Sequence, residues 1–152
     1  MKRILLMIGV SLFGSTLSTH SQAESDEIAI VVNKANPETA LTRDKLRPLF
    51  QTTQTQWPRG TPAAPVNLPE DSALRKGFDA AVLGLDPERA ARYWTDRKIR
   101  GGERPPRKVS STSAVLRAVS EDVGGVGYVL MGDVTPAVKV IGRIRGGQVV
   151  AP

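Results

Sequence analysis

The sequence predicts an α/β domain in which helices flank a small mixed or mostly parallel sheet, and three observations indicate this fold class. Apolar, strand-like runs alternate with segments of helical periodicity from residue 28 to residue 141. A length of 152 residues fits one domain, and 40% hydrophobic with 24% charged residues is an ordinary globular composition. The sequence contains no internal repeat and no low-complexity tract, so we expect one folding unit.

Residues 1–23 are interpreted as a cleaved signal peptide that lies outside this domain. Two basic residues precede an apolar stretch that reaches about Leu17, and the triplet Ser21-Gln22-Ala23 supplies small residues where signal peptidase acts. The apolar stretch is too short to span a bilayer. Cleavage after Ala23 would leave residues 24–152 as an exported domain, periplasmic or secreted, that does not span the membrane.

The residue composition excludes most hydrolase chemistry from residues 24–152. The sequence has no Cys, and its one His, His20, lies in the predicted signal peptide. Such a domain cannot hold a Ser-His-Asp or Cys-His arrangement, nor the usual Cys and His ligands of zinc. We therefore expect a protein that is not an enzyme and has no metal and no cofactor. The formal net charge of +6 favours anionic partners.

The first half of the domain predicts a strand, a helix and a second strand. Residues 28–32 form a continuous apolar, β-branched run, which is typical of a strand covered on both faces. Residues 42–50 begin with a Thr cap and carry one apolar stripe at helical spacing. The polar residues 51–65, rich in Thr, Gln and Pro, predict a loop that leads into a short strand at residues 66–68.

The second half predicts three helices followed by two strands. Asp71 or Ser72 caps a helix that ends at Gly84, and Asp86 caps the next helix, which runs to about Lys98. The remaining expected elements are a basic loop at residues 101–108, a helix from about residue 110, strands at residues 126–130 and 138–141, and a frayed end at residues 146–152.

The segment from Glu70 to Arg75 carries the best candidate binding chemistry. It passes from a strand end into a helix N-terminus, where free backbone N–H groups and the positive end of the helix dipole attract anions. The Ser72 hydroxyl and the Arg75 guanidinium can add donors there. The same residues also describe an ordinary capped helix with Arg75 on its solvent face, and position alone favours that interpretation.

Two other features have a structural and a functional interpretation. The basic run within residues 97–108 is either a solvated loop or a dock for an anionic partner, and nucleic acid fits poorly because no aromatic residue interrupts the run. Tyr93 and Trp94 follow Ala90 at helical spacing, which favours core packing over a ligand cage. Trp57 lies in a polar loop without periodic partners, so we interpret it as a lid or as a contact for a partner.

Five short motifs follow one another along residues 24–152. They are IVVN at residues 30–33, LTRDKLRPLF at 41–50, WPRG at 57–60, VNLPEDSALR at 66–75 and GGVGYV at 124–129. This ordered set resembles the substrate-binding proteins of phosphate-type ABC transporters, in which the fourth motif is the anion loop. The resemblance covers nearly all of the expected domain and implies one lobe of a type 2 periplasmic binding protein.

The resemblance implies binding of phosphate or a related oxyanion, linked to ABC-type uptake. In the family's anion loop an Arg, an Asp and a Ser-Gly-Thr run contact the ion. Here Leu68 stands at the Arg position, which removes the strongest charge-assisted contact, and Glu70 stands at the Asp position. A Glu70 carboxylate that faced the ligand would prefer a protonated oxyanion. The implied ligand-binding residues are Glu70, Ser72, Ala73, Leu74 and Arg75.

The expected domain supplies only one lobe, whereas the family clamps its ligand between two. A second chain or a membrane protein partner would then supply the missing wall. The alternative is a non-transport interaction module in the periplasm. It would dock to an envelope or membrane protein through Trp57 and the basic loop at residues 97–108.

Overall fold

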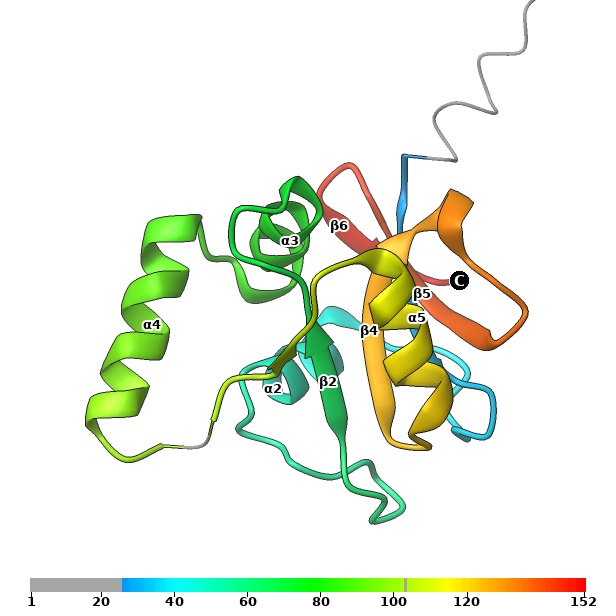
Figure 1. Ribbon diagram of the computed structural model, residues 1–152, viewed down its shortest axis with the longest axis horizontal. Helices are drawn as coiled ribbons and strands as arrows, with labels where there is room; N and C mark the ends of the chain where they lie inside the picture. Colours follow the sequence, from blue (N-terminus) through cyan, green and yellow to red (C-terminus); the bar gives the residue numbers. More distant parts are fainter. Residues whose placement is uncertain (1–25, 103) are drawn as a thin grey trace, which may run out of the picture.

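A computed structural model of the chain describes residues 26–102 and 104–152. The predicted signal peptide therefore lies outside the described residues. Six strands form one open sheet in the order β3-β2-β4-β1-β5-β6 (Figure 1). The strands are β1 (Ile28–Asn33), β2 (Ala64–Asn67), β3 (Arg107–Lys108), β4 (Gly125–Leu130), β5 (Val138–Arg145) and β6 (Gln148–Val150).

The sheet is mixed, which confirms the predicted fold class. β1 pairs antiparallel with both β4 and β5, while β2 pairs in parallel with β3 on one side and β4 on the other. Every residue of β1 is buried. This central position explains why its sequence is uniformly apolar instead of alternating between apolar and polar residues.

Side-chain capping fixes the starts of three helices. The Ser72, Asp86 and Ser111 side chains accept hydrogen bonds from the backbone N–H three residues ahead, as the sequence predicts for Ser72 and Asp86. Gly84 ends the second predicted helix at a φ of 68°, where a residue without a Cβ is favoured. The helices are α2 (Arg43–Phe50), α3 (Ala73–Phe78), the π-helical turn η1 (Asp79–Leu83), α4 (Pro87–Ile99), α5 (Thr112–Glu121) and the 3-10 turn η2 (Met131–Asp133).

Helices cover both faces of β4, because successive residues of a strand point to opposite faces. On one face Tyr128 stacks on Phe78 of α3, with ring centroids 3.9 Å apart. On the other face Gly127 lies under α5, and a Cβ at this position would come within 2.6 Å of a methyl group of Val115. Gly127 therefore lets α5 approach the sheet closely.

The helix α4 differs from the sequence-based expectation. It stands away from the sheet (Figure 1), and Ala90 is its only buried residue. Tyr93 and Trp94 are half-buried and pack edge to face against each other, with centroids 5.0 Å apart. The prediction that they pack in the core is wrong. Helical spacing indicates that residues share a face, but it does not say what covers that face.

Two short strands replace a predicted loop and a predicted frayed end. β3 lies within the basic segment and pairs with β2, and β6 forms a hairpin with β5. The turn of this hairpin uses Gly146 and Gly147, both at positive φ. Strands of two or three residues carry too little periodicity to be read from sequence, and here they depend on a partner strand.

Candidate functional site at the carboxyl end of β2

The segment between β2 and α3 runs along the end of a parallel strand pair and turns into a helix. A turn closes from the Ser72 N–H to the Pro69 carbonyl at 3.1 Å, and the Ser72 hydroxyl then accepts from the Arg75 N–H. Within the described part of the chain, the backbone N–H groups of Ala73 and Leu74 have no acceptor. The segment therefore presents two amide donors beside a hydroxyl group.

Arg75 is buried, in contrast to the sequence-based interpretation that places it on the solvent face of an ordinary capped helix. Only 4% of its surface is exposed. Its Nε donates to the Asp79 carboxylate at 2.7 Å, and its Nη1 donates to the Leu68 carbonyl at 2.8 Å. Because Arg75 and Asp79 are four residues apart, they lie on the same face as Phe78 and turn inward with it. Arg75 therefore holds the end of β2 from beneath and does not reach into solvent.

Asp79 completes this buried ion pair and retains one oxygen without a partner. The residue is 5% exposed, and its Oδ1 accepts no hydrogen bond within the described residues. Burial raises the pKa of the Asp79 carboxyl above its usual value, and Arg75 offsets only part of this effect. The pair therefore keeps a charged guanidinium next to a carboxylate that is costly to ionise.

A second buried network fixes the last residues of β2. The Tyr128 hydroxyl donates to Asn67 Oδ1 at 2.9 Å and accepts from the Leu68 N–H at 3.3 Å. Burial raises the pKa of Tyr128 far above its usual value, so the hydroxyl stays protonated. Together with Arg75, this tyrosine holds Leu68 by both its N–H and its carbonyl.

Glu70 lies at the outer edge of the segment and pairs with Lys108 of β3. Lys108 Nζ is 3.2 Å from Glu70 Oε2, and both side chains are more than half exposed. The pKa of Glu70 is lowered mainly by a hydrogen bond from its own backbone N–H. The neighbouring Lys108 lowers this pKa further. Glu70 is therefore an ionised carboxylate at neutral pH.

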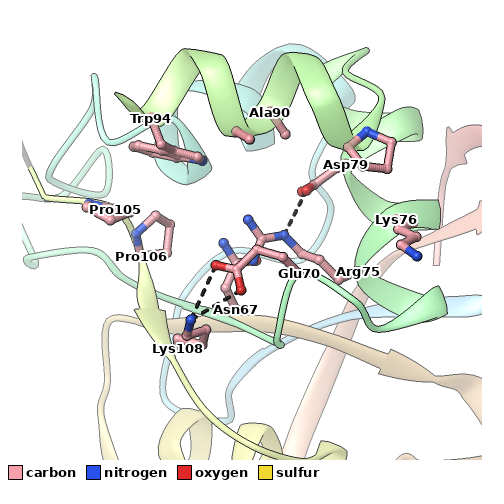
Figure 2. Close-up of a pocket in the computed structure, with 12 residues that line it drawn as sticks. Asn67, Glu70, Arg75, Lys76, Asp79, Ala90, Trp94, Pro105, Pro106 and Lys108 are labelled. Atoms are coloured by element: carbon pink, nitrogen blue, oxygen red, sulfur yellow. Dashed lines mark hydrogen bonds and ion pairs between the residues drawn. The ribbon is translucent and has the colours of Figure 1, made fainter. Parts of the chain in front are cut away.

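A pocket of about 350 Å³ lies between this segment and α4 (Figure 2). Its lower side in the view carries the charged groups of Glu70, Arg75 and Lys108, and its upper side carries Trp94 and other apolar side chains. Among residues 26–102 and 104–152, no group of three or more His, Cys, Asp or Glu could hold a metal ion. The pocket therefore combines a charged side, which includes the Arg75 guanidinium, with an apolar side.

The structure places the predicted site residues in two groups. Glu70 and Arg75 line the pocket, whereas Ser72, Ala73 and Leu74 lie at the start of α3 and are not among its lining residues. Sequence reasoning missed Asp79 altogether. The available signal was its spacing of four residues from Arg75 on the same face as Phe78, which is typical of a paired charge.

Trp57 is a core residue. It is 3% exposed, and its Nε1 donates to the Gly124 carbonyl at 2.9 Å. This burial contradicts the expectation that Trp57 presents a surface to a partner, because the polar loop folds its one large apolar side chain against the end of β4. A lone Trp in a polar loop has no periodic neighbours, so the sequence did not show this packing.

The basic run within residues 97–108 is largely solvated. Arg100, Arg104 and Arg107 are exposed, whereas Arg97 turns inward and donates to the Gln51 carbonyl at 2.9 Å. In the part of the chain that the structure describes, no helix has the length and apolar character needed to cross a membrane.

Comparison with solved structures identifies the class of fold. The chain has the fold of substrate-binding proteins of phosphate ABC transporters, as the sequence motifs suggested. A phosphate transport receptor from Vibrio cholerae superposes with a TM-score of 0.59 at 26% identity, over 81% of this chain and 52% of that chain.

Two further solved structures give the same result. A phosphate substrate-binding protein from Clostridium perfringens with bound phosphate has a TM-score of 0.62 at 19% identity, over 76% of this chain and 44% of that one. PstS from Borrelia burgdorferi has a TM-score of 0.59 at 13% identity, with coverages of 81% and 53%. No protein-family model and no curated protein sequence matches the chain.

The chain spans about half the length of these solved structures. A span of this size is what one lobe of a two-lobed binding protein provides. Two of these proteins are described as a phosphate transport receptor and a phosphate substrate-binding protein, which are not enzymes.

Proposed function

We propose that this protein binds phosphate or a related small oxyanion at the start of α3, as an exported component linked to ABC-type uptake. The observation that carries the proposal is the pair of N–H groups of Ala73 and Leu74, which have no acceptor among the described residues and lie beside the Ser72 hydroxyl. Amide donors at a helix N-terminus attract anions through their hydrogen bonds and through the helix dipole. The likeness in fold to a protein with bound phosphate supports this ligand class.

The charged residues of the segment have different roles in this proposal. Glu70 borders the site as a carboxylate, and an anion that carries a proton can donate to it. Hydrogen phosphate has such a proton and sulfate does not, so phosphate is preferred. Arg75 acts indirectly, since its Nη1 holds the Leu68 carbonyl and so positions the segment.

A second wall is needed for tight binding. An ion held by one lobe has water on its open side, where each electrostatic contact is weak. A second chain or a membrane protein partner would cover that side. The protein by itself therefore binds its oxyanion weakly.

Calorimetric titration of the purified protein with phosphate and with sulfate tests the proposal. The informative variant is Ser72→Asp, because Asp is as good a helix cap as Ser but places a negative charge where the anion binds. We expect this variant to keep its stability and to lose phosphate binding. A matched control is Ser120→Asp near the end of α5, which adds the same charge away from the site.

Two results would overturn the proposal. One is phosphate binding by Ser72→Asp as strong as that of the wild type and of Ser120→Asp. The other is sulfate binding equal to or tighter than phosphate binding, which would contradict the role given to Glu70.

A further inference from the structure

The pocket between α4 and the end of β2 is not lined by Ser72, Ala73 or Leu74, which form the proposed oxyanion site at the start of α3, although Glu70 borders both. Its volume is about 350 Å³. Cavities of ~150 Å³ are large enough to bind benzene. The pocket therefore has room for a single aromatic ring with a polar group attached.

The wall on the α4 side is apolar. Ala90, Ala91 and Trp94 face the pocket from α4, and Pro105 and Pro106 enclose it from the segment that follows. The Trp94 indole is half-buried, and its Nε1 has no hydrogen-bond partner within the described residues. This wall favours an apolar body, and an indole presents a large flat surface to an aromatic ring.

The opposite side of the pocket offers a buried cation. Arg75 is 4% exposed, and its Nε and Nη1 are occupied by Asp79 and by the Leu68 carbonyl. Its Nη2 has no acceptor among the described residues, and the guanidinium faces the pocket (Figure 2). A charge-assisted contact to a buried guanidinium is about twice as strong as one between neutral groups.

The charges around the pocket favour a ligand with a single negative charge. Asp79 takes one edge of Arg75, and Glu70 and Lys108 neutralise each other at the rim. The pocket is lined by three cations and two carboxylates, which leaves one net positive charge for a ligand: Arg75, Lys76 and Lys108 against Glu70 and Asp79. A monoanion needs only the Nη2 edge of Arg75.

We propose that this pocket binds a small organic anion whose apolar or aromatic body packs against Trp94 and the two prolines while its oxyanion headgroup contacts Arg75 Nη2. The ligand class is an aromatic carboxylate or a singly ionised aromatic phosphonate. This activity goes beyond the proposed binding of inorganic oxyanions, because Ser72 and the amides of α3 take no part in it.

Four probes distinguish the contribution of the headgroup to binding from that of the apolar body: benzoate, phenylphosphonate, benzyl alcohol and inorganic phosphate. Benzyl alcohol has the ring without the charge, and inorganic phosphate has the charge without the ring. Calorimetry on the wild type measures each affinity. Fluorescence of Trp57→Phe gives a second readout, because Trp94 is then the one remaining tryptophan of the chain.

The test variant is Ala91→Phe, which fills the pocket from the exposed side of α4, and its matched control is Ala80→Phe, an exposed position of η1 that does not line the pocket. We expect benzoate or phenylphosphonate to bind the wild type saturably, to change Trp94 emission, and to bind Ala91→Phe at least about tenfold more weakly, a loss of ~1.4 kcal/mol. Ala80→Phe should bind as the wild type does.

The Ser72→Asp variant distinguishes this proposal from the preceding one. We expect it to retain benzoate binding while inorganic phosphate binding is lost. The proposal is overturned if neither organic anion binds the wild type, if benzyl alcohol binds as well as benzoate, or if Ala91→Phe and Ala80→Phe bind equally.

Discussion

Arg75 and Asp79 lie one helical turn apart and form an ion pair that is almost completely buried, with Arg75 Nε 2.7 Å from Asp79 Oδ2. The pair spans the point where α3 changes into the π-helical turn η1. Through Arg75 Nη1 it also holds the Leu68 carbonyl at the end of β2. One buried pair therefore supports both the segment at the start of α3 and the charged side of the pocket.

Removal of one partner of this pair should be strongly destabilising. We expect Asp79→Ala to lower the free energy of unfolding by about 3–5 kcal/mol, because it leaves the Arg75 charge buried and unpaired. The double variant Arg75→Met/Asp79→Leu should lose less than Asp79→Ala alone. Urea denaturation of the wild type, Asp79→Ala and the double variant measures both losses in the free energy of unfolding. A double variant as unstable as Asp79→Ala would contradict this account.

The raised pKa of Asp79 gives the stability a specific pH dependence. Between the ordinary pKa of 3.8 and its raised folded value, the folded state binds more protons at Asp79 than the unfolded state does. This contribution to stability therefore grows as the pH falls through that interval. The amide of Asp79→Asn does not titrate, so the free energy of unfolding of the wild type minus that of Asp79→Asn should rise as the pH falls through this interval. Denaturant titrations of both proteins at several pH values above 3.8 check it, and a signed difference that stays constant or falls on acidification would disagree.

Tyr128→Phe tests the network at the end of β2. The variant keeps the ring that stacks on Phe78, but Asn67 Oδ1 and the Leu68 N–H lose their partner. Two buried groups without partners should cost about 1–3 kcal/mol of stability. The matched control is Tyr93→Phe on α4, where we expect a smaller change. Equal losses in thermal or urea unfolding would show that the Tyr128 hydroxyl is dispensable.

Glu70→Gln tests the proposed preference for a protonated oxyanion. The amide can donate to an unprotonated anion, which the carboxylate cannot do. We therefore expect the variant to bind phosphate and sulfate with similar affinity, whereas the wild type favours phosphate. Lys108→Gln, which removes the exposed partner of Glu70, should change stability by no more than ~1 kcal/mol. If calorimetric titrations show that Glu70→Gln still prefers phosphate over sulfate as the wild type does, Glu70 does not contribute to the site.

The two tryptophans should differ in solvent access. In Trp94→Phe, the remaining emission from Trp57 should be weakly quenched by acrylamide, because that residue is 3% exposed. In Trp57→Phe, Trp94 should be quenched more strongly. The Trp57→Phe protein should remain folded, since the Gly124 carbonyl still accepts from the Ala64 N–H. Equal quenching of the two variants would be inconsistent with the burial of Trp57.

The predicted fold class and most helix starts were confirmed, and the predicted site only partly matches what the structure assembles. Ser72 and Asp86 are caps, and Gly84 ends a helix at positive φ, because capping and glycine signals act within a few residues. The inward turn of Arg75 was not predicted. A charged residue on a helix is ordinarily assigned to solvent. Arg75 can be buried because the Asp79 carboxylate pairs with it and offsets part of the desolvation cost.

The sequence by itself determined the order of the main strands and helices, the exclusion of His- and Cys-based catalysis from residues 24–152, and the motifs that match phosphate-binding proteins. These features depend on residue type and on spacing within a few turns of chain. The tertiary structure decided the short strands β3 and β6, the burial of Trp57 and the pocket beside α4. Each of these depends on contacts between residues far apart in the chain, such as Glu70 with Lys108, and no local pattern encodes which distant partner a residue meets.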